Sequence, residues 1–231
     1  MNKEKILSIG AVVLVVGVVA GLAIFAKNKG KEPVVSNAPT VATVNGVAIT
    51  KDAYDAQLAT AITAFKGQGM NTDDPTQLAQ IKTQVLNDLI SNELVTQGIA
   101  AAGIKPTDAE VEAQFQAVLT QVGGMDKLKE QLVAANLTEA QLRINITRQL
   151  AVQAYLTKNI DMSTTTVTDA EIQKFYDDNV KNLPKGQTAP VFKDVKEQIR
   201  QQLVSNKQQV LITAFVASLK EKAKVETTST L

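Results

Sequence analysis

Apolar and polar residues alternate over one short stretch of the chain, and elsewhere they follow the three-to-four-residue spacing of α-helices. The stretch 41–50, VATVNGVAIT, has small and β-branched residues on both sides of Asn45 and Gly46. Asn-Gly is the preferred pair for a two-residue hairpin turn. The pattern therefore predicts a short β-hairpin, and Thr50 is placed to cap the helix that follows it.

Helical periodicity covers most of the chain after residue 50. Pro75 fits the first turn of a helix, Gly103 fits a helix end, and Gly123 with Gly124 separates two helices. Together with the apolar spacing, these residues predict helices over 51–66, 75–102, 107–121, 125–135, 138–159 and 191–224. Residues 224–227 predict a strand after the last helix. That helix carries an apolar seam of Val195, Ile199, Leu203, Val210, Ala214, Phe215 and Leu219.

Three segments begin with the same helix-start chemistry. In each, a Thr is followed three residues later by Glu or Gln, so that the two side chains can satisfy each other's backbone N–H groups in a capping box. The pairs are Thr107 with Glu110, Thr138 with Gln141, and Thr168 with Glu171. Shared capping chemistry explains the similarity without an internal repeat.

Residues 6–26, ILSIGAVVLVVGVVAGLAIFA, contain no charged side chain. As a helix they would be roughly 30 Å long, which matches the hydrocarbon core of a bilayer. The sequence therefore predicts a retained transmembrane anchor between a flank at 1–5 and a flexible tether at 27–40. The alternative is a cleaved secretory signal, whose apolar region is ordinarily shorter.

The anchor sequence bears on dimerisation and topology as well. Gly17 and Gly21 form a GxxxG pair, which could dock a second helix in a homodimer, although glycine is also common in membrane helices that do not dimerise. Lysines stand on both sides of the apolar run, so the positive-inside rule does not decide the orientation.

The composition narrows the fold and the chemistry. The chain is 45% hydrophobic but only 4% aromatic, and its Ala, Val, Leu and Ile lie among Gln, Glu and Lys, which favours a mainly α fold. The 24 basic and 23 acidic residues balance, which argues against a nucleic-acid partner. The sequence has no His and no Cys, so we expect no side-chain catalysis, no metal site and no cofactor.

Four segments in a fixed order resemble the SurA/PrsA class of chaperones. Residues 41–58 (VATVNGVAITKDAYDAQL) resemble the opening hairpin and first helix of the SurA N-terminal domain, and residues 81–115 (IKTQVLNDLISNELVTQGIAAAGIKPTDAEVEAQF) resemble its long central helix. Residues 167–179 (VTDAEIQKFYDDN) are similar to the segment that leads into the isomerase module of the family. Residues 190–226 (PVFKDVKEQIRQQLVSNKQQVLITAFVASLKEKAKVE) are similar to the C-terminal helix that follows that module.

The resemblance implies one SurA-N-like domain over 41–231, mainly α, with a small antiparallel β element. In such a domain the helix 191–224 packs back on the N-terminal part, and the terminal strand joins the hairpin. Where the family carries a parvulin-type prolyl isomerase domain, this chain has only a polar loop at 180–190. A parvulin site uses paired histidines, so the resemblance implies no catalytic residue here.

We therefore expect a holdase chaperone that binds unfolded or exported polypeptides in an apolar helical cleft, without ATP and without isomerase activity. Its expected location is the bacterial plasma membrane, as a single-pass protein with the C-terminal domain outside the cytoplasm. The sequence does not indicate which residues line the cleft, although Met70 and Met125, which lie beside glycines, suit an adaptable rim.

Two other functions remain open from the sequence. The first is a structural or assembly subunit that docks one specific membrane or envelope partner. The second is an enzyme, either a degenerate prolyl isomerase or a hydrolase that uses carboxylates such as Asp73 and Asp74. These two residues precede Pro75 at a helix start, where acidic side chains are expected because of the helix dipole.

Overall fold

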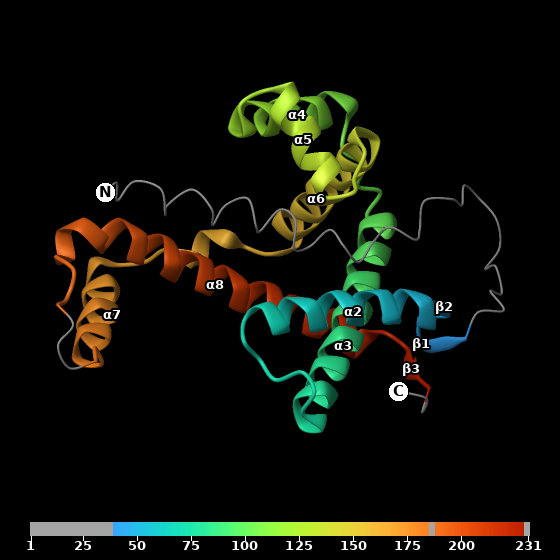
Figure 1. Cartoon of the computed structure of the whole chain (residues 1–231), viewed down its shortest axis with the longest axis horizontal. Helices are drawn as coiled ribbons and strands as arrows, with labels where there is room; N and C mark the ends of the chain where they lie inside the picture. Colours follow the sequence, from blue (N-terminus) through green and yellow to red (C-terminus); the bar gives the residue numbers. More distant parts are fainter. Residues whose placement is uncertain (1–38, 185–187, 229–231) are drawn as a thin grey trace.

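The computed structural model describes residues 39–184 and 188–228, in which a small sheet lies at one end of a mainly helical molecule, beside α2 and α3 (Figure 1). This confirms the predicted mainly helical fold with a small antiparallel β element. In chain order the elements are β1 (Thr40–Val44), β2 (Val47–Thr50), α2 (Lys51–Gly67), α3 (Pro75–Ala101), α4 (Asp108–Val122), α5 (Met125–Ala134), α6 (Glu139–Asn159), η1 (Met162–Thr165), α7 (Asp169–Lys181), α8 (Phe192–Lys222) and β3 (Val225–Thr227).

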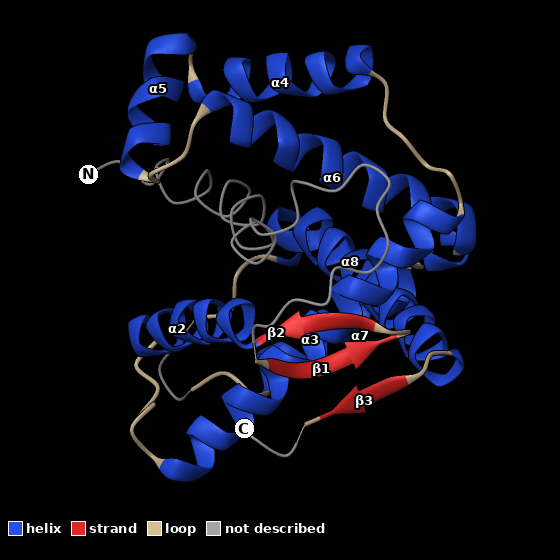
Figure 2. Ribbon diagram, turned by 90° about the vertical axis from the view of Figure 1, so that its right-hand side faces the viewer, coloured by secondary structure: helices blue, strands red, loops and turns tan. Residues whose placement is uncertain are grey.

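The sheet joins the two ends of the described chain in the order β2-β1-β3 (Figure 2). Asn45 and Gly46 have φ angles of 51° and 85°, as a two-residue hairpin turn requires, and β1 pairs antiparallel with β2 on either side of them. β3 pairs antiparallel with the other edge of β1. Both the predicted hairpin and the predicted C-terminal strand are confirmed, and the third strand gives the hairpin the support that an isolated ribbon lacks.

A polar network fixes the hairpin turn to α3 and to the start of β3. The side-chain amide of Gln97 donates to the Val44 carbonyl oxygen at 3.0 Å and to Glu93 Oε1 at 2.7 Å, and Asn45 Nδ2 donates to Gln97 Oε1 at 2.8 Å. The backbone N–H of Lys224 donates to Asn45 Oδ1 at 2.9 Å. Burial raises the pKa of Glu93, and the hydrogen bond from Gln97 partly opposes that shift.

The main hydrophobic core lies where the sheet and α2 pack on α3. Apolar side chains recur on one face of α3, as the helical spacing predicted, and meet the inner face of the sheet. The buried members are Val41, Ala42, Val44, Ile49, Tyr54, Ile81, Val85, Leu86, Leu89, Ile90 and Leu94, with Leu219 and Val225 packed against them. The core therefore combines residues from both ends of the chain.

Helices α4, α5 and α6 form a separate lobe with its own small core, on the opposite side of the molecule from the sheet (Figure 2). Phe115 is 1% exposed and lies 3.9 Å from the guanidinium carbon of Arg143, measured to the ring centroid. Arg143 also donates to Glu112 at 2.7 Å and to Glu139 at 2.9 Å. These contacts hold α4 against α6.

All three predicted capping boxes are present at the starts of α4, α6 and α7. In each, the Thr hydroxyl accepts from the backbone N–H three residues on, and the Glu or Gln side chain accepts from the Thr backbone N–H. Helix starts were therefore readable from local chemistry, because the capping bonds involve residues only three positions apart.

The lobe joins the rest of the molecule where α3, α6 and α8 meet. Tyr155 on α6 is 6% exposed, and its ring lies 5.6 Å from that of Phe215 on α8. On the other side the tyrosine ring packs on Gly98 of α3, where an added Cβ would lie only 2.1 Å from Tyr155 Oη. We call Gly98, Tyr155 and Phe215 the three-helix junction.

The residues of the apolar seam predicted along α8 do not all pack against the same part of the protein. Near its start, Ile199 is buried beside α7, whereas near its end Leu219 packs on the main core. Between them Val210, placed in the seam by its spacing, is 67% exposed. The seam splits because α8 leaves one helix partner before it meets the next (Figure 1).

The predicted single-pass location in the plasma membrane needs correction. Within 39–184 and 188–228, no helix combines the length and the apolar character that crossing a bilayer requires. The long helices α3 and α8 are long enough, but polar and charged side chains recur along both. The prediction is thus wrong for the described part of the chain, and residues 6–26, including Gly17 and Gly21, lie outside it.

The three-helix junction predicts that Gly98→Ala destabilises the protein. Alanine is favoured over glycine inside a helix by roughly 0.5–1 kcal/mol, but here the new Cβ would lie 2.1 Å from Tyr155 Oη and 2.4 Å from Cζ of its ring. Overpacking of this kind costs about 1–3 kcal/mol, so we expect a lower midpoint in urea-induced unfolding.

Gly67→Ala is the matched control, because nothing lies within 4 Å of the Cβ position there. We expect that variant to be neutral or slightly more stable. If the two variants unfolded at the same urea concentration, the close contact between α3 and α6 would be absent in solution.

Candidate polypeptide-binding hollow

Helix α7 is amphipathic and lays its apolar face on the first half of α8. Ile172 is fully buried between the two helices, and Phe175, Tyr176 and Val180 follow it at helical spacing. Helix α7 ends at Lys181 and α8 begins at Phe192, and the Tyr176 hydroxyl on α7 reaches the carbonyl oxygen of Pro190 just before α8. The C-terminal end of α7 therefore lies beside the start of α8.

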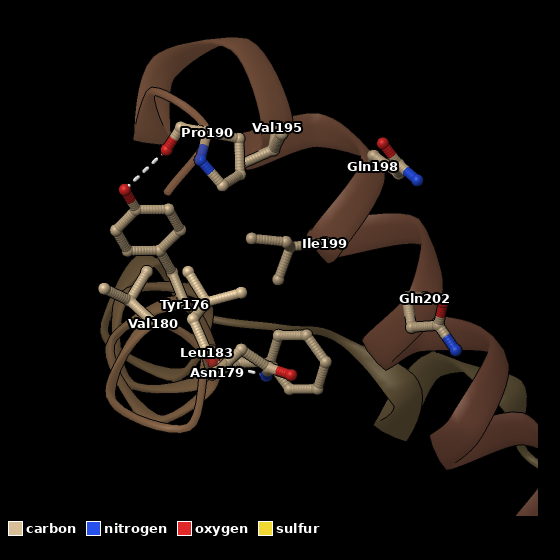
Figure 3. A pocket seen from close by; sticks show the side chains of 10 residues that line it. Tyr176, Asn179, Val180, Leu183, Pro190, Val195, Gln198, Ile199 and Gln202 are labelled. Atoms are coloured by element: carbon tan, nitrogen blue, oxygen red, sulfur yellow. Dashed lines mark hydrogen bonds between the residues drawn. The ribbon is translucent and has the colours of Figure 1, made fainter. Parts of the chain in front are cut away.

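These two helix ends enclose a hollow of about 250 Å³ (Figure 3). Ile199 on α8 faces Val180 and Leu183 across it, and carboxamide side chains lie at the rim (Figure 3). We call it the α7–α8 hollow, and its lining consists of Phe175, Tyr176, Asn179, Val180, Leu183, Pro190, Val195, Gln198, Ile199 and Gln202.

Tyr176 holds the mouth of the hollow together. Its hydroxyl donates to the carbonyl oxygen of Pro190 at 2.6 Å, and its ring lies 5.1 Å from that of Phe192, nearly edge to face. Asn179 donates through Nδ2 to the Phe175 carbonyl oxygen at 2.7 Å. These contacts hold Tyr176 and Asn179 in place on the α7 side of the hollow.

The opposite end of α7 is held to α8 by charge. Asp169 accepts from Lys196 at 2.9 Å and from Arg200 at 2.9 Å, and Glu171 pairs with Lys207 at 2.7 Å. The hydrogen bond from Lys207, followed by those from Thr168, lowers the pKa of Glu171 from 4.5 to about 2. The hydrogen bond from Lys196 likewise comes first among the causes that lower the pKa of Asp169.

The chemistry of the α7–α8 hollow suits binding. Each of its ten lining residues is uncharged, and most are aliphatic or aromatic. In the described part of the chain, no group of three or more acidic side chains is placed to hold a metal ion. A hollow of this character can accept an apolar side chain, which is stabilised there by the removal of its surface from water.

The structure separates the residues that the sequence singled out. Asp74 caps α3 by accepting from the N–H groups of Thr76 and Gln77, both at 2.9 Å, and Asp73 lies 3.3 Å from Lys66 Nζ. Asp74 therefore serves a helix start, whereas Asp73 pairs with Lys66 at the end of α2. They do not contribute to the hollow.

Met70 and Met125 do not line the hollow either. Their side chains are 40% and 38% exposed, and they belong to the loop after α2 and to the first turn of α5. The adaptable rim predicted for them is not part of the α7–α8 hollow.

Sequence reasoning missed the hollow, although its helices were partly recognised. The helical spacing of Phe175, Tyr176 and Val180 indicated an apolar face on α7, as the spacing of Val195 and Ile199 did on α8. Neither pattern indicates that these two apolar faces pack against each other. The pairing of the faces is tertiary information.

The architecture agrees with comparisons to known proteins. The family model for the SurA-like N-terminal domain matches residues 2–156. The chain belongs to this family. The resemblance to SurA/PrsA-like chaperones inferred from the sequence is thereby confirmed, while α7, α8 and the hollow lie beyond the matched residues.

Two curated relatives of this SurA-like chain are foldase proteins PrsA. That of Clostridium perfringens is 32% identical over 152 residues, which cover 61% of this chain and 42% of the relative. That of Clostridium kluyveri is 27% identical over 155 residues, which cover 61% of this chain and 46% of the relative. The matched region thus spans less than half the length of these relatives.

A solved structure described as one of two related SurA-like chaperones of Campylobacter jejuni, PEB4 and Cj1289, has a similar fold. The superposition has a TM-score of 0.52 at 15% sequence identity and covers 84% of this chain and 100% of the other. At this identity the likeness concerns the fold.

The ion pairs of α7 predict that the stability of the folded protein depends on pH, and that Glu171→Gln removes part of this dependence. The folded-state pKa of Glu171 is lowered from 4.5 to about 2, so its stabilising effect is fully present above pH 4.5 and is lost as the pH falls toward 2. Gln keeps the capping bond, as Gln141 does at α6. The thermal midpoint of the wild type should exceed that of the variant at neutral pH, and the gap should close between about pH 4.5 and 2.

Glu221→Gln is the control, because Glu221 lies exposed on α8 and makes no ion pair or hydrogen bond to another described residue. A gap between wild type and Glu171→Gln that stayed constant down to pH 2 would contradict the charged attachment of α7.

Proposed function

We propose that the chain is a holdase chaperone that binds unfolded polypeptides through the α7–α8 hollow, without ATP and without prolyl isomerase activity. The observation that carries the proposal is an open, uncharged and mostly apolar hollow in a chain of the SurA-like family. Unfolded chains share exposed apolar side chains and little else, so a site that binds them by burial of apolar surface needs little sequence preference.

Two features support the absence of isomerase activity: the chemistry that catalysis would need, and the order of segments along the chain. The barrier to rotation about a peptide bond is about 18–20 kcal/mol, and lowering it requires a pocket complementary to the twisted amide. The family resemblance places a parvulin domain with paired histidines after α7, and this sequence contains no His. We propose that residues 41–231 act as one domain, in which the segment 180–190 stands in place of the isomerase.

Binding without ATP follows from the same reasoning. The sequence has no phosphate-cradling glycine-rich loop of the kind that precedes a helix in nucleotide-binding proteins. Release of a client would then depend on the client folding and covering its own apolar residues.

Val195→Asp tests the proposal, because it places a charge in the lining of the hollow. Burying one large apolar side chain contributes about 1.5–3 kcal/mol, so we expect the variant to need at least about ten times the wild-type concentration to suppress aggregation of two unrelated unfolding proteins. Light scattering measures this. Position 195 lies in the first turns of α8, where Asp is compatible with the helix dipole.

Val133→Asp is the matched control, because Val133 is 80% exposed on α5 and lies outside the hollow. A second variant, Leu183→Gln, changes the hollow from the α7 side without a charge and should show a smaller loss. Equal activity of all three variants and the wild type would overturn the proposal. Protection of one client alone would favour an assembly subunit with a dedicated partner.

Isomerase activity is tested separately by the refolding of a protein whose slow phase is limited by proline isomerisation. At a tenth of the substrate concentration, we expect the chain to leave the rate of that phase unchanged. Acceleration by the wild type would contradict the part of the proposal that excludes catalysis.

A further inference from the structure

A face of α8 that begins at the α7–α8 hollow carries uncharged polar side chains along the length of the helix. Its members are exposed and lie within one sector of the helix: Gln198, Gln202, Asn206, Gln209 and Thr213. We call this the α8 polar face. The charged residues Lys196, Arg200 and Lys207 project from a different sector, toward α7 and η1.

A similar face exists on the first half of α3. It borders a shallow groove of about 550 Å³ lined only by uncharged residues: Thr76, Ala79, Gln80, Thr83, Gln84 and Asn87. We call this the α3 polar face. Further along the same sector of α3, Ile90 and Leu94 are buried in the main core.

The two polar faces meet where α8 crosses α3. Lys220 lies one to two turns beyond Thr213 on the same side of α8, and its Nζ donates to Asn87 Oδ1 at 2.9 Å. The crossing helices are in direct contact (Figure 1). The α8 and α3 polar faces therefore form one path, which begins at the hollow, is uncharged except at Lys220, and ends in the α3 groove.

Most carboxamides on this path have no hydrogen-bond partner among the described residues. The side chains of Gln80, Gln84, Gln198, Gln202 and Asn206 make no hydrogen bond to another described residue. Each carboxamide offers two N–H donors and a carbonyl acceptor. A peptide main chain is neutral and carries the same donor and acceptor groups, so it complements such a surface better than a charged ligand does.

Spacing and length agree with an extended chain. Residues four apart on a helix rise about 6 Å, close to the roughly 6.6 Å between alternate residues of an extended strand. Gln198 and Gln202 are four residues apart, and both line the hollow (Figure 3). From Gln198 to Lys220 is about 33 Å, and from Thr76 to Asn87 about 16 Å. Together they match about 15 extended residues.

We propose that this path binds the main chain of an extended, uncharged polypeptide segment, while the α7–α8 hollow takes one of its apolar side chains. The inference rests on the proposed chaperone function and deepens it. The substrate is then a segment of about 15 residues with a large apolar residue near one end. Because the path binds main-chain amides, which every sequence has, the protein can bind segments of many different sequences.

Two fluorescent peptides with blocked ends test the path. One has 15 residues of Ser, Thr and Gln with a single Leu near one end, and the other is the six-residue part around that Leu. Fluorescence anisotropy with the full chain should show tighter binding of the longer peptide. Its depsipeptide analogue, in which esters replace alternate amides and so remove N–H donors, should bind more weakly than the all-amide peptide.

Two double variants test the α8 polar face and the α3 polar face separately. Gln198→Glu with Gln202→Glu should weaken both peptides about 5- to 10-fold, because a carboxylate offers no N–H donor. Gln80→Glu with Gln84→Glu should weaken only the 15-residue peptide. Glu and Gln have similar helix propensities, so the fold should persist, and circular dichroism checks it.

Gln149→Glu with Gln201→Glu adds the same charge at exposed positions of α6 and α8 away from the path, and it should bind both peptides like the wild type. If the α3 double variant bound the longer peptide as tightly as the wild type, the path would be overturned while the hollow could still bind clients. If the wild type bound neither peptide, or if Val195→Asp bound as well as the wild type, the proposed function itself would fail.

Discussion

The contact of Tyr155 with Gly98 on one side and Phe215 on the other sets the geometry of the whole molecule. It is the point at which α3, α6 and α8 approach one another, and the approach is possible because Gly98 has no side chain. Each of the three helices then extends away toward a different part of the protein. Helix α3 carries the sheet, α6 belongs to the α4–α6 lobe and α8 contacts α7, so the junction links these three parts of the molecule (Figure 1).

The two halves of α8, on either side of that junction, are attached to the protein by different interactions. Its C-terminal half is held by apolar burial against the main core, through Leu219, and by continuity with β3. Its N-terminal half holds α7 through exposed ion pairs at one end and aromatic contacts at the other. Exposed pairs such as Asp169 with Lys196 contribute little individually. The attachment of α7 therefore depends more on the buried Ile172 and on the aromatic residues, of which Phe175 and Tyr176 also line the hollow.

Local chemistry was sufficient to predict much of the fold. Asn45 and Gly46 specified the hairpin, and the three capping boxes specified helix starts, because the interacting groups are within a few residues of one another. The α8 seam could not be assigned correctly from its spacing, since Val210 has the periodicity of a core residue and is nevertheless exposed. The α7–α8 hollow escaped prediction for the same reason. Periodicity reports that a face is apolar, but not which other face covers it.

Chaperone binding through the α7–α8 hollow requires that client polypeptides contact its lining directly. Placing a photo-crosslinking amino acid at position 183, which lines the hollow, and separately at position 133, on the exposed face of α5, measures this directly. The account predicts that an unfolded client crosslinks efficiently from position 183 and only at background level from position 133. Background crosslinking from position 183, or equal crosslinking from both positions, would contradict it.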